Sequence, residues 1–331
     1  MNKLHHLPPA LLGDKSSLSN QARAEIQGLC GAQPKAFLLQ VIGAWSVILT
    51  TIALAIHMDT IWMSIVAIVV IATRQNILAL LVHEQTHLLS FQGQYGDLIA
   101  NLLAAYPLGI TTQGYANAHL SHHKYYFTDK DPDFLRKSGA DWTFPMKPSH
   151  LAKLLARDLI GLSFIKLLKE KQLNEIGIFK RTYSTPRWPQ PAFYLIVTGV
   201  AVYTETWNIF LIYWILPLIT VFPIIIRLGA ITEHIYNLPG ANVNQSSPLI
   251  ILSWWEKLLL PNLNFSLHPY HHLFPGVAYC NLPKIHEIFQ REKLVNKKNI
   301  FFGYWNYLKY LQFYQNISIV KDEKNKNPHT Y

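Results

Sequence analysis

Histidine is the residue whose number and spacing most clearly suggest chemistry in this sequence. Fifteen histidines occur among 331 residues, and eight of them fall into three short clusters. One cluster has two histidines four residues apart, and the other two each have histidines at positions i, i+3 and i+4. These spacings place side chains on one face of a helix, or close together in a turn. The clusters are His83-Glu84-Gln85-Thr86-His87, His119-Leu120-Ser121-His122-His123 and His268-Pro269-Tyr270-His271-His272.

The repeated clusters indicate a metal site. A single HxxxH cluster is common on amphipathic helices, but adjacent histidines cost helix propensity and have no obvious packing reason to recur in two distant segments. Zinc sites use three or four protein ligands, so eight or nine imidazoles predict two ions. Iron, copper and zinc all accept imidazole, and spacing does not choose among them. His234, which follows the last apolar stretch, is the expected ninth ligand.

The elements that position these histidines are predicted to span a membrane. Half of the residues are apolar and 15% are charged, which is low for a soluble globular protein. About 20 helical residues cross a hydrocarbon core of about 30 Å. The sequence therefore predicts an all-α integral membrane protein with four transmembrane helices in two hairpins, over residues 36–57, 60–82, 191–203 and 207–226.

Two shorter apolar stretches are predicted to form interfacial helices. They cover residues 97–110 and 248–260, and the second would place Trp254 and Trp255 at headgroup depth. Residues 124–190, which are polar, basic and interrupted by prolines, are predicted to form a cytoplasmic cap together with the histidine clusters.

The absence of internal repeats or low-complexity tracts predicts a single domain over residues 1–331. Its parts are an N-terminal cytoplasmic segment, a core and a C-terminal cytoplasmic tail, at residues 1–35, 36–290 and 291–331.

Lysine and arginine predict the orientation. Four precede the first apolar stretch, thirteen lie between residues 83 and 190, ten follow residue 228, and the two short turns have none. By the positive-inside rule, both termini and the histidine clusters face the cytoplasm in a multi-pass protein of the cytoplasmic or inner membrane. The net charge of +10 is explained by anionic headgroups, so no nucleic-acid partner is expected. Cys30 and Cys280 are too few for a disulfide framework.

The three clusters and their flanking residues resemble the membrane-bound fatty acid desaturase family. Its members carry HxxxH, HxxHH and HxxHH boxes between paired spanning helices, and the likeness covers most of residues 36–290. It extends to Asp131-Pro132-Asp133 after the second box and to the segment from Asn264 to Pro275 around the third. The sequence is similar to those of the bacterial branch of the family that contains dihydrorhizobitoxine desaturase-like proteins.

This resemblance implies a non-haem di-iron centre that uses dioxygen and two electrons to remove hydrogens from an unactivated acyl chain. Iron is implied because this chemistry needs a redox metal, which zinc is not. An asparagine that some members have four residues before the extra histidine is replaced here by Ala230, and Asn264 is a candidate substitute. Asp131 and Asp133 would orient histidines, or would form a solvated turn. The implied ligands are His83, His87, His119, His122, His123, His234, His268, His271 and His272.

The partners that the resemblance implies are the bilayer, an acyl substrate and an electron donor. The substrate would be linked to lipid, acyl carrier protein or coenzyme A. The donor would be a ferredoxin, or a small haem cytochrome with its reductase, because no flavin or haem-attachment fingerprint occurs in the chain. Arg74, inside an apolar stretch, would contact a substrate headgroup or pair with Glu84 or Asp97.

Three other functions fit parts of the pattern. A hydroxylase or ketolase acting on alkanes or carotenoids would use the same histidine boxes. A membrane zinc protease would use His83-Glu84-Gln85-Thr86-His87 as its HExxH motif, but would leave both HxxHH clusters without a role. A haem or metal carrier would not need the i, i+3, i+4 triplets. The substrate, the double-bond position and the oligomeric state do not follow from the sequence.

Overall fold

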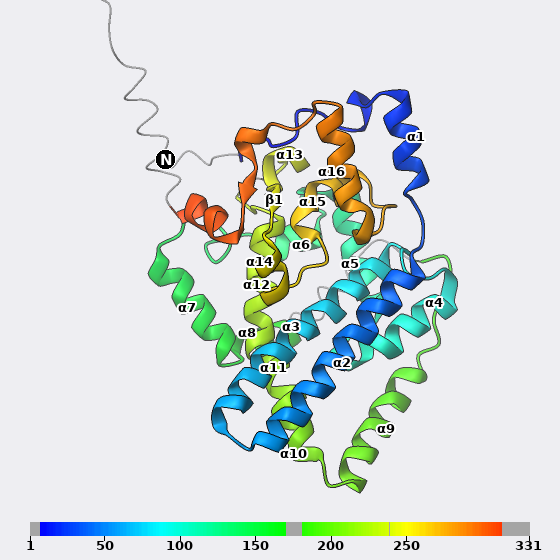
Figure 1. Ribbon diagram of the computed structural model, residues 1–331, viewed down its shortest axis with the longest axis vertical. Coiled ribbons are helices and arrows are strands. Elements are labelled where there is room, and N and C mark those ends of the chain that lie inside the picture. The colour runs from blue at the N-terminus through cyan, green and yellow to red at the C-terminus, as the bar shows by residue number, and fades with distance from the viewer. Residues whose placement is uncertain (1–6, 170–180, 238, 313–331) are drawn as a thin grey trace, which may run out of the picture.

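The secondary structure of the described residues is mainly helical (Figure 1). The computed structural model describes residues 7–169, 181–237 and 239–312. Within these residues the one sheet pairs β1 (Ile250–Ile251) in parallel with β2 (Phe301–Phe302), so the predicted all-α class is confirmed. The α-helices are α1 (Asn20–Gly28), α2 (Pro34–Met58), α3 (Ile61–Thr86), α4 (Gly93–Ala100), α5 (Thr112–Tyr125), α6 (Pro132–Arg136), α7 (Pro148–Leu159), α8 (Leu162–Lys169), α9 (Pro189–Tyr203), α10 (Trp207–Phe210), α11 (Leu216–Ile219), α12 (Val221–Glu233), α13 (Val243–Ser246), α14 (Trp254–Leu259), α15 (His268–Leu273) and α16 (Leu282–Arg291).

Short segments of tighter or wider helix connect these elements. The 3-10 segments are η1 (Lys15–Ser17), η3 (Tyr106–Leu108), η6 (Phe265–Leu267), η7 (Tyr279–Asn281) and η8 (Lys297–Asn299), and the π-helical segments are η2 (Asn101–Ala105) and η5 (Leu211–Ile215).

Helices α2 and α3 form the first hairpin. Asp59 ends α2 in the left-handed conformation (φ 43°), and the Thr60 hydroxyl accepts the Met63 N–H to begin α3. The two helices are packed along small or β-branched residues such as Ala44, Ile48 and Ala67, while the opposite faces expose large apolar side chains, as expected for lipid contact. Helix α3 continues through the first histidine box without a break.

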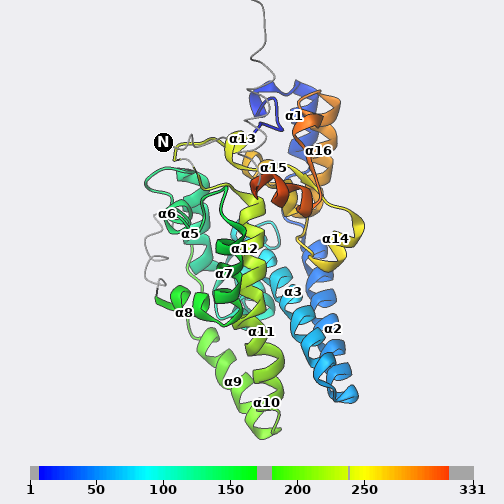
Figure 2. The same ribbon diagram turned by 90° about the vertical axis from the view of Figure 1, so that its left-hand side faces the viewer.

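In the part of the chain that the structure describes, three helical segments are long and apolar enough to cross a membrane: α2, α3 and the continuous run from Trp207 to Glu233. Helix α9 has 15 residues, about 22 Å, which is shorter than a hydrocarbon core of about 30 Å. The fourth predicted span is therefore not confirmed. Figure 2 shows the α2/α3 pair and the α9/α10 pair at the end of the molecule opposite α1 and α16.

The π-helical segments are stabilised by side chains from neighbouring helices. A π-turn leaves backbone carbonyl groups without their usual partners, and inside a membrane such groups need a donor. The Trp45 indole N–H donates to the Leu103 carbonyl in η2 at 2.9 Å, and the Gln75 amide donates to the Trp214 carbonyl in η5 at 2.9 Å. The Trp45 and Trp214 rings also stack, with centroids 5.1 Å apart. These contacts hold α2, η2 and η5 around α3.

The two predicted interfacial stretches differ from the observed elements. The first is helical from Gly93 to Leu108, as α4, η2 and η3. The second, residues 248–260, is not one helix: its β-branched start pairs as β1, and α14 begins only after Ser253, whose hydroxyl and N–H both contact the Glu256 carboxylate. Trp254 is 78% exposed and Trp255 50%, consistent with an interfacial position. Parts of the predicted cap and C-terminal tail, residues 170–180 and 313–331, lie outside the described residues.

A buried ion pair joins the cap to the last spanning helix. Asp158 of α7 accepts a hydrogen bond from Arg227 Nη2 of α12 at 3.0 Å, and the side chains are 1% and 12% exposed. The guanidinium also lies over the Trp142 ring, 4.8 Å from its centroid. Because the pair is buried, each charge depends on the other for compensation.

We therefore expect Asp158→Ala to destabilise the protein strongly. The substitution leaves Arg227 buried without its carboxylate, which costs about 3–5 kcal/mol when a buried pair is broken. The matched control is Asp141→Ala, because Asp141 lies 3.7 Å from Arg157 and both side chains are more than a third exposed; such pairs contribute about 0–1 kcal/mol. The unfolding temperature in detergent measures the difference, and equal losses in both variants would contradict the expectation.

Candidate metal centre

Four helices bring the histidines together. The first box occupies the last turn of α3, the second lies on α5, the third lies on α15, and His234 directly follows α12. Thr111 caps α5 by accepting the Gly114 N–H, and Pro269 occupies the first turn of α15, where a missing N–H costs nothing. The second and third boxes thus lie on short helices with defined starts, whereas the first lies at the end of a long one.

The chain turns sharply beside each box. Leu88 follows the first box with φ 59°, Phe127 follows the second with φ 57°, and Leu263 and Asn264 precede the third with φ 47° and 60°. This left-handed conformation costs a non-glycine residue roughly 1–2 kcal/mol. Such strain often concentrates at functional sites, where surrounding contacts enforce it.

Five histidines form group one. Nε2 of His119 lies 2.9 Å from Nε2 of His87 and 3.0 Å from Nε2 of His123, which is 3.0 Å from Nε2 of His271. The His83 ring centroid lies 4.1 Å from that of His119 and 4.6 Å from that of His271. Both ring nitrogens of His83 are buried without a hydrogen-bond partner.

Four histidines form group two, centred on His234. Its Nε2 atom lies 3.3 Å from Nε2 of His122, 3.0 Å from that of His268 and 3.1 Å from that of His272. The two groups adjoin, because the His123 and His272 rings stack with centroids 4.2 Å apart. Each HxxHH box therefore contributes to both groups.

The donor geometry fits one metal ion in each group. Two imidazole nitrogens that each lie about 2.0–2.1 Å from one ion, at angles between about 90° and 110°, are about 3 Å apart. The observed separations of 2.9–3.3 Å agree with this value. Burial also lowers the pKa of His87 to about 3 and holds those of His119, His234 and His271 well below the usual value. Neutral imidazoles keep the lone pairs that a metal requires.

His122 is oriented by Asp131. The Asp131 Oδ2 atom lies 2.8 Å from His122 Nδ1 and also accepts the Phe127 N–H, while Oδ1 accepts two N–H groups at the start of α6. With the side chain fully buried, four contacts fix this carboxylate. A carboxylate on Nδ1 sets the tautomer that leaves Nε2 free for a metal.

His234 is oriented by two hydroxyl groups that the sequence did not point to. Its Nδ1 atom lies 2.8 Å from Ser247 Oγ and 3.1 Å from the Tyr126 hydroxyl, which also contacts Ser246 at 2.7 Å. Tyr126 stands four residues after His122, on the same helical face, so spacing could have indicated it. Ser247 has no comparable local signal, because the fold alone brings it to His234.

Asp133 and Asn264 lie apart from the histidines. Asp133 contacts Arg136 at 2.6 Å and Lys137 at 2.8 Å, and it accepts the Tyr236 hydroxyl at 3.0 Å. Among the described residues it therefore orients a charged network rather than an imidazole. The amide nitrogen of Asn264, the residue predicted to replace the asparagine missing at Ala230, donates to the Tyr279 carbonyl at 3.2 Å.

Arg74 does not form an ion pair with either Glu84 or Asp97, the two partners predicted for it. Its Nε atom donates to the Thr73 hydroxyl at 3.1 Å, and Asp97 is paired instead with Arg181 at 3.0 Å. The Glu84 carboxylate accepts the Tyr279 N–H at 3.0 Å.

Comparison with known proteins gives two matches. The sequence model of a family described as fatty acid desaturase matches residues 60–304, which is more than half of the chain and contains all nine clustered histidines. The chain is also 23% identical, over 242 residues, to dihydrorhizobitoxine desaturase of Bradyrhizobium elkanii. That alignment covers 69% of this chain and 68% of the relative.

We expect Asp131→Asn to weaken metal binding while the fold is retained. The amide preserves the shape of the side chain but removes the charge that orients His122, and the loss of such a partner typically costs 10–100-fold in metal affinity. Metal content after dialysis against a graded chelator measures the change. Asp129→Asn, in the same turn, is the control, and equal metal retention in both variants would refute the role of Asp131.

Proposed function

This chain belongs to the fatty acid desaturase family, and from that premise we propose that it is a membrane-bound, dioxygen-dependent oxidoreductase that introduces a double bond into a fatty acyl chain or a similar aliphatic substrate. The observation that carries the proposal is the convergence of nine imidazoles into two adjoining groups. Three spanning helices are consistent with a substrate drawn from the bilayer.

We propose that each histidine group holds one iron ion. Group one would use His83, His87, His119, His123 and His271, and group two would use His122, His234, His268 and His272. When bound, the two irons would let dioxygen accept two electrons from a donor, two protons from solvent, and two hydrogens with their electrons from the substrate, giving an alkene and two water molecules.

The chain's own residues would hold and shield this centre. Asp131 orients His122, and Ser247 orients His234. The Phe265 ring packs edge-on against His83, with centroids 4.5 Å apart, and closes one side of group one with an apolar surface. A site from which water is excluded protects reactive species from side reactions.

The remaining partners and the topology belong to the same proposal. The substrate would be an acyl group linked to lipid, acyl carrier protein or coenzyme A, and electrons would come from a ferredoxin, or from a small haem cytochrome with its reductase. Helix α9, although short, would complete the second hairpin with the helical run that begins at Trp207. Residues 36–290 would form the core of one domain, with both termini and the histidines on the cytoplasmic side.

We predict that His271→Ala and His122→Ala each lower bound iron and abolish desaturation, because each removes a ligand from a different group. The wild-type protein should bind about two irons per chain, whereas about one zinc would favour a protease. His286→Ala is the matched control, since this half-buried histidine contacts Tyr270 and Gln290 rather than the two groups. Elemental analysis and product chromatography provide the measurements. Full activity with normal iron in either ligand variant would refute the assignment.

The proposed topology predicts which residues an impermeant maleimide reaches in intact cells. Cys30 is exposed and precedes α2, so it should react only after the membrane is opened. Thr204→Cys, in the exposed turn between α9 and α10 and in a background without native cysteines, should react in intact cells. Labelling of Cys30 in intact cells would show that the orientation is opposite to the one proposed. If neither position is labelled in intact cells, α9 does not span the membrane.

A further inference from the structure

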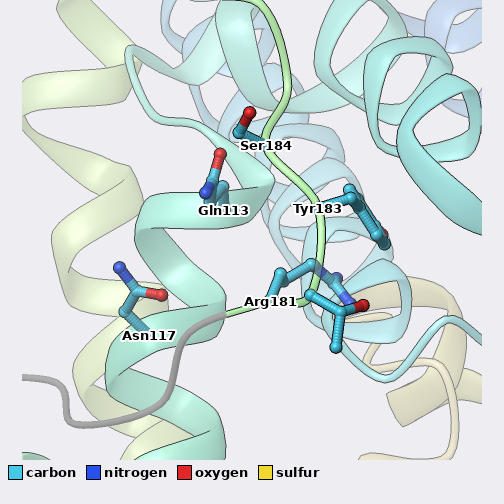
Figure 3. A pocket seen from close by; sticks show the side chains of 6 residues that line it. Gln113, Asn117, Arg181, Tyr183 and Ser184 are labelled. Carbon is cyan, nitrogen blue, oxygen red and sulfur yellow. The ribbon is translucent and has the colours of Figure 1, made fainter.

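A polar cavity lies beside the metal centre, between α5 and the segment at residues 181–184. Its volume is about 430 Å³, which falls in the range of small-molecule sites. Figure 3 shows Gln113 and Asn117 projecting from α5, and Arg181, Tyr183 and Ser184 projecting from the neighbouring segment. None of these residues belongs to the histidine groups, and the sequence did not mark any of them as part of a site.

The charge of this cavity is compensated from within the protein. Of the described residues that line it, only Arg181 is charged, and its Nε atom lies 3.0 Å from Asp97 Oδ2 with side chains that are 5% and 0% exposed. Arg181 Nη2 also donates to the Gln85 carbonyl at 2.9 Å, and the Tyr183 hydroxyl donates to Asp97 at 3.1 Å. Two of the three guanidinium nitrogens therefore face internal partners, and the Asp97 carboxylate balances the positive charge, which reduces its net attraction for a polyanion.

The remaining polar groups suit an uncharged ligand. The Asn117 Oδ1 atom is buried and has no hydrogen-bond partner, a state that is costly unless a donor fills it. Gln113 Oε1 accepts the Thr185 hydroxyl at 2.9 Å, which leaves its amide nitrogen as a donor. A free acceptor beside a free donor complements a group that has both, such as an amide or a hydroxyl.

The cavity is joined directly to the helices that carry the histidines. Gln85, whose carbonyl accepts from Arg181, lies between His83 and His87 on α3, and Asn117 stands two residues before His119 on α5. Residues two apart on a helix point to opposite sides, so α5 presents the cavity on one side and the imidazoles on the other. A helix is about 10–12 Å wide with its side chains. A ligand that reaches from the cavity to the metals therefore reacts several bonds away from its polar end.

We propose that this cavity binds the polar end of the substrate, and that this end is an uncharged hydrogen-bonding group, an amide, ester or hydroxyl, rather than a polyanionic carrier. The proposal rests on the desaturase function proposed above. It assigns Asn117 and Gln113 as residues that determine specificity for the head of the substrate, while the histidine groups act on its chain.

The test compares probes that share one alkyl chain and differ in their heads. The probes are octadecanamide, monooctadecanoylglycerol, octadecanoate and octadecanoyl-coenzyme A. Their binding to the metal-loaded protein is measured by competition in detergent. The wild type should bind the two uncharged probes about tenfold or more tightly than the coenzyme A thioester. The reverse order would overturn the proposal.

Variants at one position separate recognition from folding. Asn117→Leu should weaken binding of the amide several-fold, the scale of one lost hydrogen bond, and Asn117→Lys should shift the preference toward octadecanoate. Asn244→Leu is the matched control, because Asn244 also has a buried, unpartnered Oδ1 atom but lies on α13, away from the cavity. Metal content in each variant verifies that α5 is intact. Unchanged head preference in both Asn117 variants would overturn the proposal.

Turnover distinguishes this proposal from the proposed function. If the probes bind in the expected order but none is desaturated by the iron-loaded protein with an electron donor, the cavity assignment stands and the desaturase function fails. If an acyl probe is desaturated with the same KM by the wild type and by Asn117→Leu, the function stands and the cavity assignment fails.

Discussion

Convergence of imidazole nitrogens is the constraint on which the rest of this structure depends. The Nε2 atoms of eight histidines gather in two groups, each lying about 3 Å from another, and both ring nitrogens of the adjacent His83 are buried without a hydrogen-bond partner. Two lone pairs brought this close repel each other unless a proton or a metal cation lies between them, and a cation can satisfy all the nitrogens of a group at once. Helices α3, α5, α12 and α15 must therefore be held in fixed relative positions, because a shift of about 1 Å in any of them would remove a nitrogen from the range of an ion.

The surrounding fold supplies that rigidity through buried polar contacts. The Asp158–Arg227 pair fixes α12 against α7, and the Arg181–Asp97 pair fixes the end of α3 against α4. Within the spanning helices, Trp45 and Gln75 satisfy carbonyl groups of the π-helical segments. A buried polar or charged group that loses its partner destabilises the fold. Each of these contacts therefore disfavours alternative helix positions as well as stabilising the observed one.

Much of this organisation could be predicted from local patterns. Charge-free stretches of about 20 residues predicted α2, α3 and the long run from Trp207, since length and hydropathy suffice for a spanning helix. The same criterion leaves the span predicted at residues 191–203 unconfirmed, because α9 is short for a hydrocarbon core. It was wrong about a single helix at residues 248–260, where two β-branched residues pair with a distant segment. Whether an isoleucine pair forms a strand depends on its partner, here Phe301 and Phe302, which no local window contains.

For the site, the sequence by itself pointed to the residues: the three boxes by their type and spacing, and His234 by its position after the last apolar stretch and by the family resemblance. Only the tertiary structure decided how they divide, with His119 and His123 in one group and His122 in the other. It also decided that Asp131 forms a hydrogen bond with a histidine, whereas Asp133 contacts Arg136, Lys137 and Tyr236. The reason is that periodicity places side chains on a face of their own helix, whereas partners are set by the packing of helices far apart in the chain.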